Sequence, residues 1–541
     1  MKPTSKFLLF LPWRLLSALL LVSFSIGTIT AQLYDSRSTT QKFNAAFQLI
    51  SMAYVDSVDH QELAETAIKG MLKELDPHSV YMTKEEVTRA NEPLIGNFEG
   101  IGVQFQIFKD TIVIISPIPG GPSDKLGIMA GDKIVKINGE ESVGEIINNN
   151  FVMERLRGKK GSEVTVSIFR QGKKDLLEFT IIRDKIPLNS VDATYMVSDE
   201  TGYIRLNRFA RTTMTEVREA ITALKLAGMQ NLILDLRNNS GGYLDVAVDL
   251  SDEFLDRDKM IVYTEGLRSP RQDFRATSRG SLLKGKVIVM INEGSASASE
   301  IVAGAVQDWD RGLVLGRRSF GKGLVQRPFN LPDSSVIRLT TARYYTPSGR
   351  SIQKPYDEGV AEYHKDIFKR LEHGEMVHAD SIHFPDSLRY TTNNKRIVYG
   401  GGGIMPDIFL PVDTLGTSEY YSRLSRRGVI NSFTLDYMNQ NRQELEKKYP
   451  AIEKFINEFK TDEAFMENFF VFAEKEGVER DSEGIEASGA HLAVMLKALL
   501  GRNLFDLNAY YRIISNIDRE LQQAIQTMAD EMVFRNLLVT N

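Results

Sequence analysis

The spacing of hydrophobic and polar residues changes along this chain and divides it into regions of different predicted structure. Between residues 40 and 92 apolar side chains such as Phe43, Phe47 and Ile50 recur at helical spacing, and a turn at 76–79 separates the predicted helices. Past residue 412 the chain is again helical and highly charged. The candidate helices there are Asn441–Lys448, Ala451–Phe459 and Leu504–Arg535.

Residues 96–184 have a different texture, with short β-rich runs separated by Gly, Pro and Asn-Gly turns. This pattern predicts a small β-barrel module. The predicted strands are Gly102–Phe108, Ile112–Ser116, Lys133–Ile137 and Val164–Arg170.

From about residue 201 to residue 350, predicted strands alternate with predicted helices. Asn231–Leu236 and Val287–Asn292 are continuous apolar runs, as expected for strands covered on both faces. Met214–Ala227 and Glu300–Val306 have helical periodicity, so the region predicts an α/β core. Residues 351–400 show no clear pattern, and the run Gly400–Gly403 predicts a loop.

The first 31 residues are typical of an export signal. Lys2 and Lys6 precede the almost uncharged run Leu15–Ile29, and Ala31 is a small residue suited to cleavage before Gln32. The alternative is an uncleaved anchor, although this run is shorter than the roughly 20 residues that span a bilayer. Both predict a location outside the cytoplasm, periplasmic or at the outer face of the inner membrane, with membrane attachment only if the segment is retained.

Composition limits the number of domains, the class of partner and the kinds of reactive group that this chain can have. At roughly 150 residues per domain, 541 residues predict three or four structural units, and 42% hydrophobic with 25% charged residues is ordinary for globular domains. The net charge of 66 − 71 = −5 gives no reason to expect nucleic acid as a partner. The chain has no cysteine, which excludes disulfides, cysteine nucleophiles, thiolate zinc sites and iron–sulfur clusters.

The densest chemical signal is Gly294–Glu300, which lies between a predicted strand and a predicted helix. Small residues there allow a serine to occupy a sharp turn at a helix N-terminus, where free N–H groups stabilise developing negative charge. One of these serines is therefore a candidate nucleophile. The alternative is a helix-capping serine in a tight turn.

A second signal is Lys322 between Gly321 and Gly323. A buried lysine loses its proton more easily, so a neutral amine here could act as a general base. One alternative is a lysine in a surface turn. Another is a phosphate loop beginning at Gly316, but Gly323 stands where that motif needs Ser or Thr.

Histidine positions favour a serine–lysine pair over a serine–histidine–aspartate triad. All seven histidines lie outside the predicted α/β core: His60, His78, His364, His373, His378, His383 and His491.

The run Asp235–Gly242 follows a predicted strand, and its glycines could turn backbone N–H groups towards a ligand as an oxyanion hole. A simple glycine turn is the alternative.

Taken together, these blocks resemble the C-terminal processing peptidases, also called tail-specific proteases. Besides the three blocks above, the resemblance rests on Thr341–Ile352 (TARYYTPSGRSI), the segment Gly402–Asp407, the turn Leu75–Ser79 and the run Gly100–Val103. It spans about residues 40–412. It implies an α/β protease core of the crotonase (ClpP/crotonase) type with an inserted PDZ domain.

The resemblance also implies site residues. It assigns the nucleophile to Ser297, the general base to Lys322 (322 − 297 = 25 residues later) and the orientation of the lysine amine to Gln326. The same match assigns the oxyanion hole to the N–H groups of Gly242 and Ala298, and a supporting role to Asp308. Ser295 and Ser299 are expected to be caps or packing residues. The reaction would need no cofactor and no metal.

The run Gly100-Ile101-Gly102-Val103 resembles the carboxylate-binding loop of PDZ domains, which predicts protein or peptide substrates with free apolar C-termini. The predicted domains are the signal segment (1–31), N-terminal helices (32–95), PDZ domain (96–184), protease core (185–412) and helical extension (413–541). The extension could support a homodimer, dock an adaptor or cover the active site.

Two other functions remain compatible with these features. A catalytically silent PDZ scaffold would bind C-terminal tails without cutting them. A crotonase-like acyl-CoA enzyme would share only the core fold. The predicted function is a serine endopeptidase with a Ser–Lys dyad.

Overall fold

The computed structural model describes residues 37–108, 110–414 and 416–539 of the chain. The predicted signal segment, residues 1–31, lies outside the described residues. The chain divides into two compact units, Met1–Leu75 and Asp76–Asn541. The described part of the first unit holds a helix over 37–53 and α2 (His60–Lys73), whose first turn is capped by the Asp59 side chain.

The second unit begins with a strand in a region whose spacing predicts only helices. β1 (Val80–Met82) pairs antiparallel with β18 (Val336–Tyr345), which comes much later in the chain. A strand of three residues is too short to produce a periodic signal, so the all-helical prediction for this region is wrong here. α3 (Lys84–Ile95) follows as predicted, opened by a capping box between Thr83 and Glu86.

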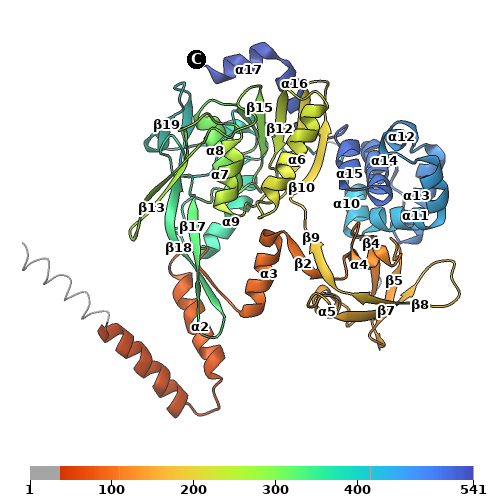
Figure 1. Cartoon of the computed structure of the whole chain (residues 1–541), viewed down its shortest axis with the longest axis horizontal. Coiled ribbons are helices and arrows are strands. Elements are labelled where there is room, and N and C mark those ends of the chain that lie inside the picture. Colours follow the sequence, from red (N-terminus) through yellow and green to blue (C-terminus); the bar gives the residue numbers. More distant parts are fainter. Residues whose placement is uncertain (1–36, 109, 415, 540–541) are drawn as a thin grey trace, which may run out of the picture. The chain divides into compact units, whose positions relative to one another are not determined.

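The β-rich region forms a separate small sheet. β2 (Asn97–Gly100) and β9 (Asp184–Pro187) pair antiparallel, so the chain enters and leaves this module side by side (Figure 1). Inside, the strand order is β3-β4-β5-β7-β8, with β6 paired to β5, around a core of buried isoleucines and valines. The elements are β3 (Val103–Phe108), β4 (Thr111–Pro117), α4 (Pro122–Lys125), β5 (Lys133–Ile137), β6 (Glu140–Glu141), α5 (Asn149–Leu156), β7 (Glu163–Phe169) and β8 (Leu177–Ile182).

The α/β core is built on a six-stranded sheet with the order β10-β11-β12-β15-β16-β21. β10 runs antiparallel to β11, and every other neighbouring pair is parallel. The carboxyl ends of β12, β15 and β16 therefore lie along one edge. The strands are β10 (Val191–Met196), β11 (Thr201–Leu206), β12 (Asn231–Asp235), β15 (Val287–Ile291), β16 (Leu313–Gly316) and β21 (Ile408–Phe409).

Helices cover both faces of this sheet, which explains the unbroken apolar runs of its strands. Leu232 and Leu234 of β12 belong to the core cluster on the side of α6, α7 and α8, whereas Ile233 packs in the cluster that contains α16 and α17. The helices are α6 (Thr213–Leu226), α7 (Leu244–Asp252), α8 (Ala298–Asp308), α16 (Arg519–Ala529) and α17 (Glu531–Leu538).

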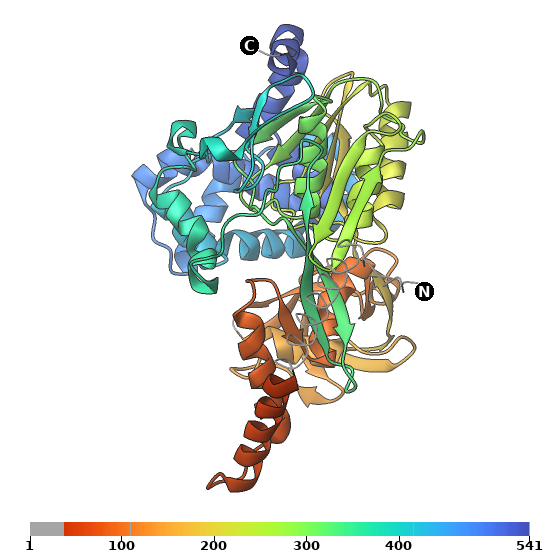
Figure 2. The ribbon, with the colours of Figure 1, turned by 90° about the vertical axis from the view of Figure 1, so that its left-hand side faces the viewer.

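A second sheet carries the strands that follow the lysine motif. Its order is β1-β18-β13-β14, and β17 (Leu324–Asn330) pairs with β18 as a long hairpin (Figures 1 and 2). β13 covers Met260–Gly266 and β14 covers Ser269–Arg275. The region without a clear pattern contains α9 (Val360–Glu372), two short 3-10 turns (Ala379–Ser381 and Asp386–Leu388), β19 (Arg389–Thr391) and β20 (Ile397–Tyr399), and Gly400–Gly403 is a loop.

The C-terminal segment is helical, as predicted, but its boundaries differ. The predicted helix Leu504–Arg535 is wrong: aspartates at 506, 518 and 530 each cap a new helix with the side chain, which divides the segment into α15, α16 and α17. Helices α10 to α15 share a core of their own that is rich in phenylalanine. They are α10 (Glu419–Arg426), α11 (Val429–Lys448), α12 (Ile452–Glu458), α13 (Glu463–Lys475), α14 (Ser482–Leu504) and α15 (Leu507–Ile514).

None of the helices in the described part of the chain combines the length and the apolar character that a membrane crossing requires.

Candidate active site

Three loops leave the carboxyl ends of the adjacent strands β12, β15 and β16. We call them the glycine loop (residues 236–243), the serine loop (292–297) and the lysine loop (317–323). They contain Gly242, Ser297 and Lys322, respectively. Because neighbouring parallel strands end at the same edge of a sheet, three motifs that are far apart in sequence lie side by side here.

Ser297 occupies a strained turn at the start of α8. Its φ of 56° and ψ of −111° are values that side-chain-bearing residues rarely adopt. The Ser297 N–H donates to Glu300 Oε2 over 2.7 Å, and the Ser297 carbonyl oxygen accepts from the N–H of Ile301 over 3.0 Å. Ala298 is the first residue of α8, where the helix leaves backbone N–H groups without an internal partner.

The two neighbouring serines join the serine loop to the glycine loop. Ser295 Oγ donates to the carbonyl oxygen of Leu236, and Ser299 Oγ donates to that of Asn239, both over 2.8 Å. Both serines are completely buried. Their hydroxyl groups therefore bind the backbone. Ser297, the middle serine of the motif, remains the candidate nucleophile.

The glycine loop lies directly against the start of α8. A Cβ at Gly241 would stand 2.9 Å from the backbone nitrogen of Ala298, so only glycine fits this approach. On either side of Gly242, the Gly241 carbonyl accepts from Phe209 N–H (3.0 Å) and the Tyr243 N–H donates to the Phe209 carbonyl (2.9 Å). This parallel bridge turns the N–H of Gly242 itself away from Phe209.

The side-chain amine of Lys322 has a hydrogen-bond partner that is itself bound to the backbone. Its Nζ donates to Gln326 Oε1 over 3.0 Å, and the Gln326 amide nitrogen donates in turn to the carbonyl oxygen of His78. Burial lowers the pKa of Lys322 from its usual value, and the positive charge of Arg338 lowers it further. Gln326 lies in strand β17, four residues after Lys322.

Two buried side chains each bind the backbone of both Ser297 and Lys322. Glu300 Oε2 accepts from the N–H of Ser297 (2.7 Å) and from the N–H of Lys322 (2.9 Å). The Tyr344 hydroxyl donates to the carbonyl oxygens of Ser297 (3.1 Å) and Lys322 (2.7 Å). The serine and lysine loops are thus joined from the N–H side and from the carbonyl side.

Glu300 is completely buried, and burial raises its pKa to about 7. Four donors oppose this shift, because its second oxygen also accepts from Ser319 Oγ (2.5 Å) and from the N–H of Gly321 (2.7 Å). Sequence reasoning identified Glu300 only as the end of the serine motif. It missed Tyr344, whose sole sequence signal is its place inside the block Thr341–Ile352.

His78 also lies beside the lysine, although the sequence places every histidine outside the core. Its ring Nε2 lies 2.8 Å from the Tyr363 hydroxyl of α9. Burial lowers the pKa of His78 to about 4, with a further contribution from Lys322, so the ring is neutral at physiological pH. The histidine therefore supports Gln326 through its carbonyl oxygen and uses its ring to bind α9.

Asp308 stands at the opposite end of α8 from Ser297. It forms an ion pair of 2.7 Å with Arg350, and both side chains are completely buried. Its other oxygen accepts from the N–H of Ser348 over 2.9 Å. Asp308 thus anchors the segment around residues 348–350 and has no contact with Lys322 or Ser297 among its hydrogen bonds in the described part of the chain.

The predicted tail-binding loop borders a groove in the small β module. A cavity of about 110 Å³ lies between β3 and α5. Gly100 ends β2 beside it, and Ser123 Oγ holds the carbonyl oxygen of Ile101 over 2.7 Å. The lining residues are Phe98, Ile101, Gly102, Val103, Phe105, Val152, Met153, Leu156 and Arg157.

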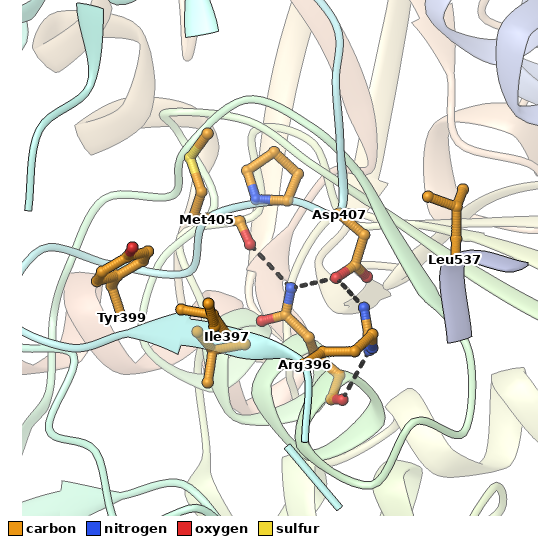
Figure 3. Close-up of a pocket in the computed structure, with 9 residues that line it drawn as sticks. Arg396, Ile397, Tyr399, Met405, Asp407 and Leu537 are labelled. Atoms are coloured by element: carbon orange, nitrogen blue, oxygen red, sulfur yellow. Dashed lines mark hydrogen bonds and ion pairs between the residues drawn. The ribbon is translucent and has the colours of Figure 1, made fainter. Parts of the chain in front are cut away.

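A larger cavity, of about 250 Å³, contains none of the predicted site residues (Figure 3). In it the Gln307 amide nitrogen donates to the Met405 carbonyl and to Asp407, and Arg396 also binds Asp407. Asp407 accepts as well from the N–H of Val314, so it connects the segment Gly402–Asp407 to β16. Because these polar groups bind one another, we interpret them as structural groups that hold this part of the core together.

Comparisons with known proteins identify peptidase and PDZ families in this chain. The sequence profile of peptidase family S41 matches residues 200–362, and that of the PDZ domain matches residues 100–181. The profile described as "Activating protease CtpB N-terminal domain" matches residues 25–86, and a family of unknown function, DUF8443, matches residues 420–506.

Curated relatives are similar over most of their length. The chain is 39% identical over 343 residues to the carboxy-terminal-processing protease of Bartonella bacilliformis, a match that covers 62% of this chain and 77% of that protein. It is 35% identical over 330 residues to the carboxy-terminal processing protease CtpA of Bacillus subtilis, covering 61% and 69%. A solved structure, the photosystem II D1 C-terminal processing protease, has 29% identity, a TM-score of 0.33 and coverage of 59% and 95%.

Proposed function

Because this chain belongs to the carboxy-terminal-processing proteases of peptidase family S41, we propose that it cuts peptide bonds with a Ser297–Lys322 dyad through an acyl-enzyme. It is a serine-type peptidase with a PDZ domain. The observation that carries the dyad is the pair of shared contacts: Glu300 and Tyr344 each bind the backbone of both residues.

The proposed reaction begins with proton transfer from Ser297 Oγ to the neutral amine of Lys322. The serine oxygen attacks the peptide carbonyl, and the N–H groups of Gly242 and Ala298 stabilise the resulting oxyanion. One such donor is worth about 3–4 kcal/mol in the transition state. Lys322 then gives the proton to the leaving amine, and a water molecule activated by the same lysine hydrolyses the acyl-enzyme.

Gln326 supports this cycle from the side. Its carbonyl oxygen accepts a hydrogen bond from the lysine amine, and its amide nitrogen is fixed on His78. The amine is therefore held in one direction whether it is neutral or charged. Burial favours the neutral form that the first step requires.

We propose that the groove between β3 and α5 receives the C-terminal tail of the substrate. The backbone around Gly102 would bind the terminal carboxylate, and the edge of β3 would pair with the tail as an added strand. The lining of the groove is mostly apolar, which favours apolar C-terminal residues.

The dyad is tested with Ser297→Ala and Lys322→Met, measured on a protein substrate with an apolar C-terminus. Both variants should lose at least about 1,000-fold in kcat, since the nucleophile or its base is gone. They should still bind the tail. Lys365→Met, at an exposed position of α9, is the matched control. A Ser297→Ala protein that cuts at the wild-type rate would refute the dyad, and a wild type that binds tails without cutting would leave only a scaffold.

Tail recognition has its own test. Amidation of the substrate C-terminus removes the carboxylate and should raise KM without lowering kcat by the same factor. Equal kcat/KM for free and amidated substrates would contradict capture of the terminus.

We further propose that the enzyme works outside the cytoplasm, on the basis of the composition of residues 1–31. N-terminal sequencing of the protein from its native cells should then give Gln32 as the first residue. Recovery of a chain that begins at Met1 from the cytoplasmic fraction would contradict export.

A further inference from the structure

A network of charged side chains joins the beginnings of the three loops. We call the first two residues of each loop its root. Arg237 is the second residue of the glycine loop, Glu293 is the second residue of the serine loop and Arg317 is the first residue of the lysine loop. All three positions lie within two residues of the carboxyl ends of β12, β15 and β16. Any group that fixes them relative to one another also fixes the loops they begin.

Arg237 is bound by carboxylates from two parts of the chain. Within its own motif it pairs with Asp235 over 2.6 Å, and burial of that carboxyl is outweighed by Arg205 and Arg237, which hold its pKa well below the usual range. At the start of α16 it pairs with the capping residue Asp518 (2.7 Å) and with Glu520 (2.8 Å).

Arg317 connects the other two loops. Its Nε donates to Glu293 over 2.7 Å, and its terminal nitrogen donates to Glu520. The backbone N–H of Arg317 also donates to the carbonyl oxygen of Ile291 at the end of β15, over 3.2 Å. The lysine loop is therefore joined to the serine loop by an ion pair and to the end of β15 by a backbone hydrogen bond.

The two oxygens of Glu520 bind different loops. Oε2 accepts from Arg237 and Oε1 accepts from Arg317. The side chains are largely buried, with exposed fractions of 11% for Glu520, 10% for Arg237 and 7% for Arg317. A charged carboxylate in this position makes short, directional bonds to both guanidinium groups.

We propose that Glu520 is a positioning residue of the active site: from the C-terminal helix α16 it joins the root of the glycine loop to the root of the lysine loop. Through Arg317 and Glu293 the connection extends to the serine loop. The inference rests on the dyad proposed above, because it assumes that the spacing of these loops sets the distances among the oxyanion donor, the nucleophile and the base.

Glu520→Gln tests this connection while keeping the shape of the side chain. An amide has one acceptor oxygen, and its NH₂ group would face a guanidinium, so one of the two loops must lose its bond. We expect kcat to fall about 10- to 100-fold with little change in KM, as misplaced catalytic groups produce. Deuterium uptake should rise in residues 236–243 and 317–323 and stay unchanged in α8 and in the PDZ domain.

Glu531→Gln is the matched control. Glu531 lies on the next helix, α17, where it pairs with Lys286 at an exposed position. Its replacement should leave kcat and loop exchange at wild-type values. Arg317→Gln removes the bond to Glu520 and also the pair with Glu293, so it should lose at least as much kcat as Glu520→Gln, and the double variant should lose little more than Arg317→Gln alone.

The outcomes separate this inference from the proposed function. If Ser297→Ala keeps its activity, the dyad fails, whatever Glu520→Gln does. If Ser297→Ala is inactive and Glu520→Gln matches Glu531→Gln in kcat, the positioning role of Glu520 alone is overturned. A loss confined to KM, or uptake that rises throughout the core sheet, would also overturn it. Should Glu520→Gln not fold, Glu520→Asp, which keeps the charge but shortens the reach, serves with the same expectations.

Discussion

Lys322 is partly buried beside Gln326 and lies near the positive charge of Arg338, and both features affect the protonation of its amine. Burial removes the water that would stabilise an ammonium group, and a nearby positive charge acts in the same direction. The structure therefore explains how a lysine could be neutral in this loop without an acidic neighbour in the sequence.

Replacing Arg338 with glutamine should move the pH dependence of the reaction. A general base must be neutral, so kcat/KM rises with pH and levels off above the pKa of Lys322. Removal of the positive charge makes the ammonium form easier to keep, which raises this pKa and shifts the rising limb to higher pH. The measurement is a pH–rate profile, with Arg343→Gln on the same strand as control. A limb that stays in place, or moves to lower pH, would contradict the assignment of Lys322 as the base.

Tyr344→Phe should separate positioning from packing. The ring is kept, but the carbonyl oxygens of Ser297 and Lys322 lose a shared donor. We expect the free energy of unfolding to fall by about 1–2 kcal/mol, and kcat to fall about tenfold from misplacement of the dyad. Urea unfolding and steady-state kinetics measure the two effects. Tyr345→Phe, at the next position of β18, should change neither, and an unchanged kcat in Tyr344→Phe would show that the hydroxyl has no role in alignment.

At the scale of elements, the groove between β3 and α5 depends on which side of a short helix faces it. Met153 lines the cavity, whereas the adjacent Glu154 is exposed to solvent. The spacing of apolar residues predicts such an amphipathic helix only weakly, because α5 has eight residues. Only the tail-binding loop was predicted, from its resemblance to PDZ domains, and the groove beside it became visible in the structure.

Met153→Glu should weaken the binding of tails by at least about tenfold, since a negative charge in the groove repels a terminal carboxylate. Amidated peptides should be affected less than peptides with free termini. Isothermal titration with both peptide forms makes the comparison, and Glu154→Gln provides the control on the same helix. Equal losses for free and amidated peptides would mean that the groove does not read the carboxylate.

At the scale of the whole molecule, the C-terminal segment is built into the rest of the second unit. Helices α16 and α17 cover one face of the core sheet, and α15 packs beside β10, where Asn508 accepts from the N–H of Thr194 over 2.9 Å. Leu435 of α11 packs with Val113 and Ile115 of the PDZ domain. The extension thus contacts both the peptidase core and the domain proposed to bind tails.

Phe534→Ala should destabilise the core although it lies at the end of the chain. Phe534 is 4% exposed and belongs to the cluster that covers the sheet, so its truncation should lower the free energy of unfolding by about 3–5 kcal/mol. Urea unfolding gives the value. Met532→Ala, on the exposed side of α17, should change it by less than about 0.5 kcal/mol. Similar values for the two variants would mean that α17 is not part of the core.

The sequence alone determined the class of fold and the family. The α/β core with an inserted PDZ domain is confirmed, as is the assignment to the serine-type C-terminal processing peptidases. These predictions succeeded because buried strands, helix starts and glycine turns depend on short stretches of sequence, so their signals survive in spacing and composition. The roles of Ser297, Lys322 and Gln326 stay predictions, although the structure brings these residues into one site.

Only the tertiary structure decided which distant groups hold that site together. Tyr344, His78 and Glu520 have no local signal that connects them to Ser297, because their roles arise where strands that are far apart in the chain end at one edge of a sheet. The same reason applies to β1 and to the helices that cover the second face. Local patterns determine what each segment becomes, whereas burial and charge pairing between segments determine which residues meet.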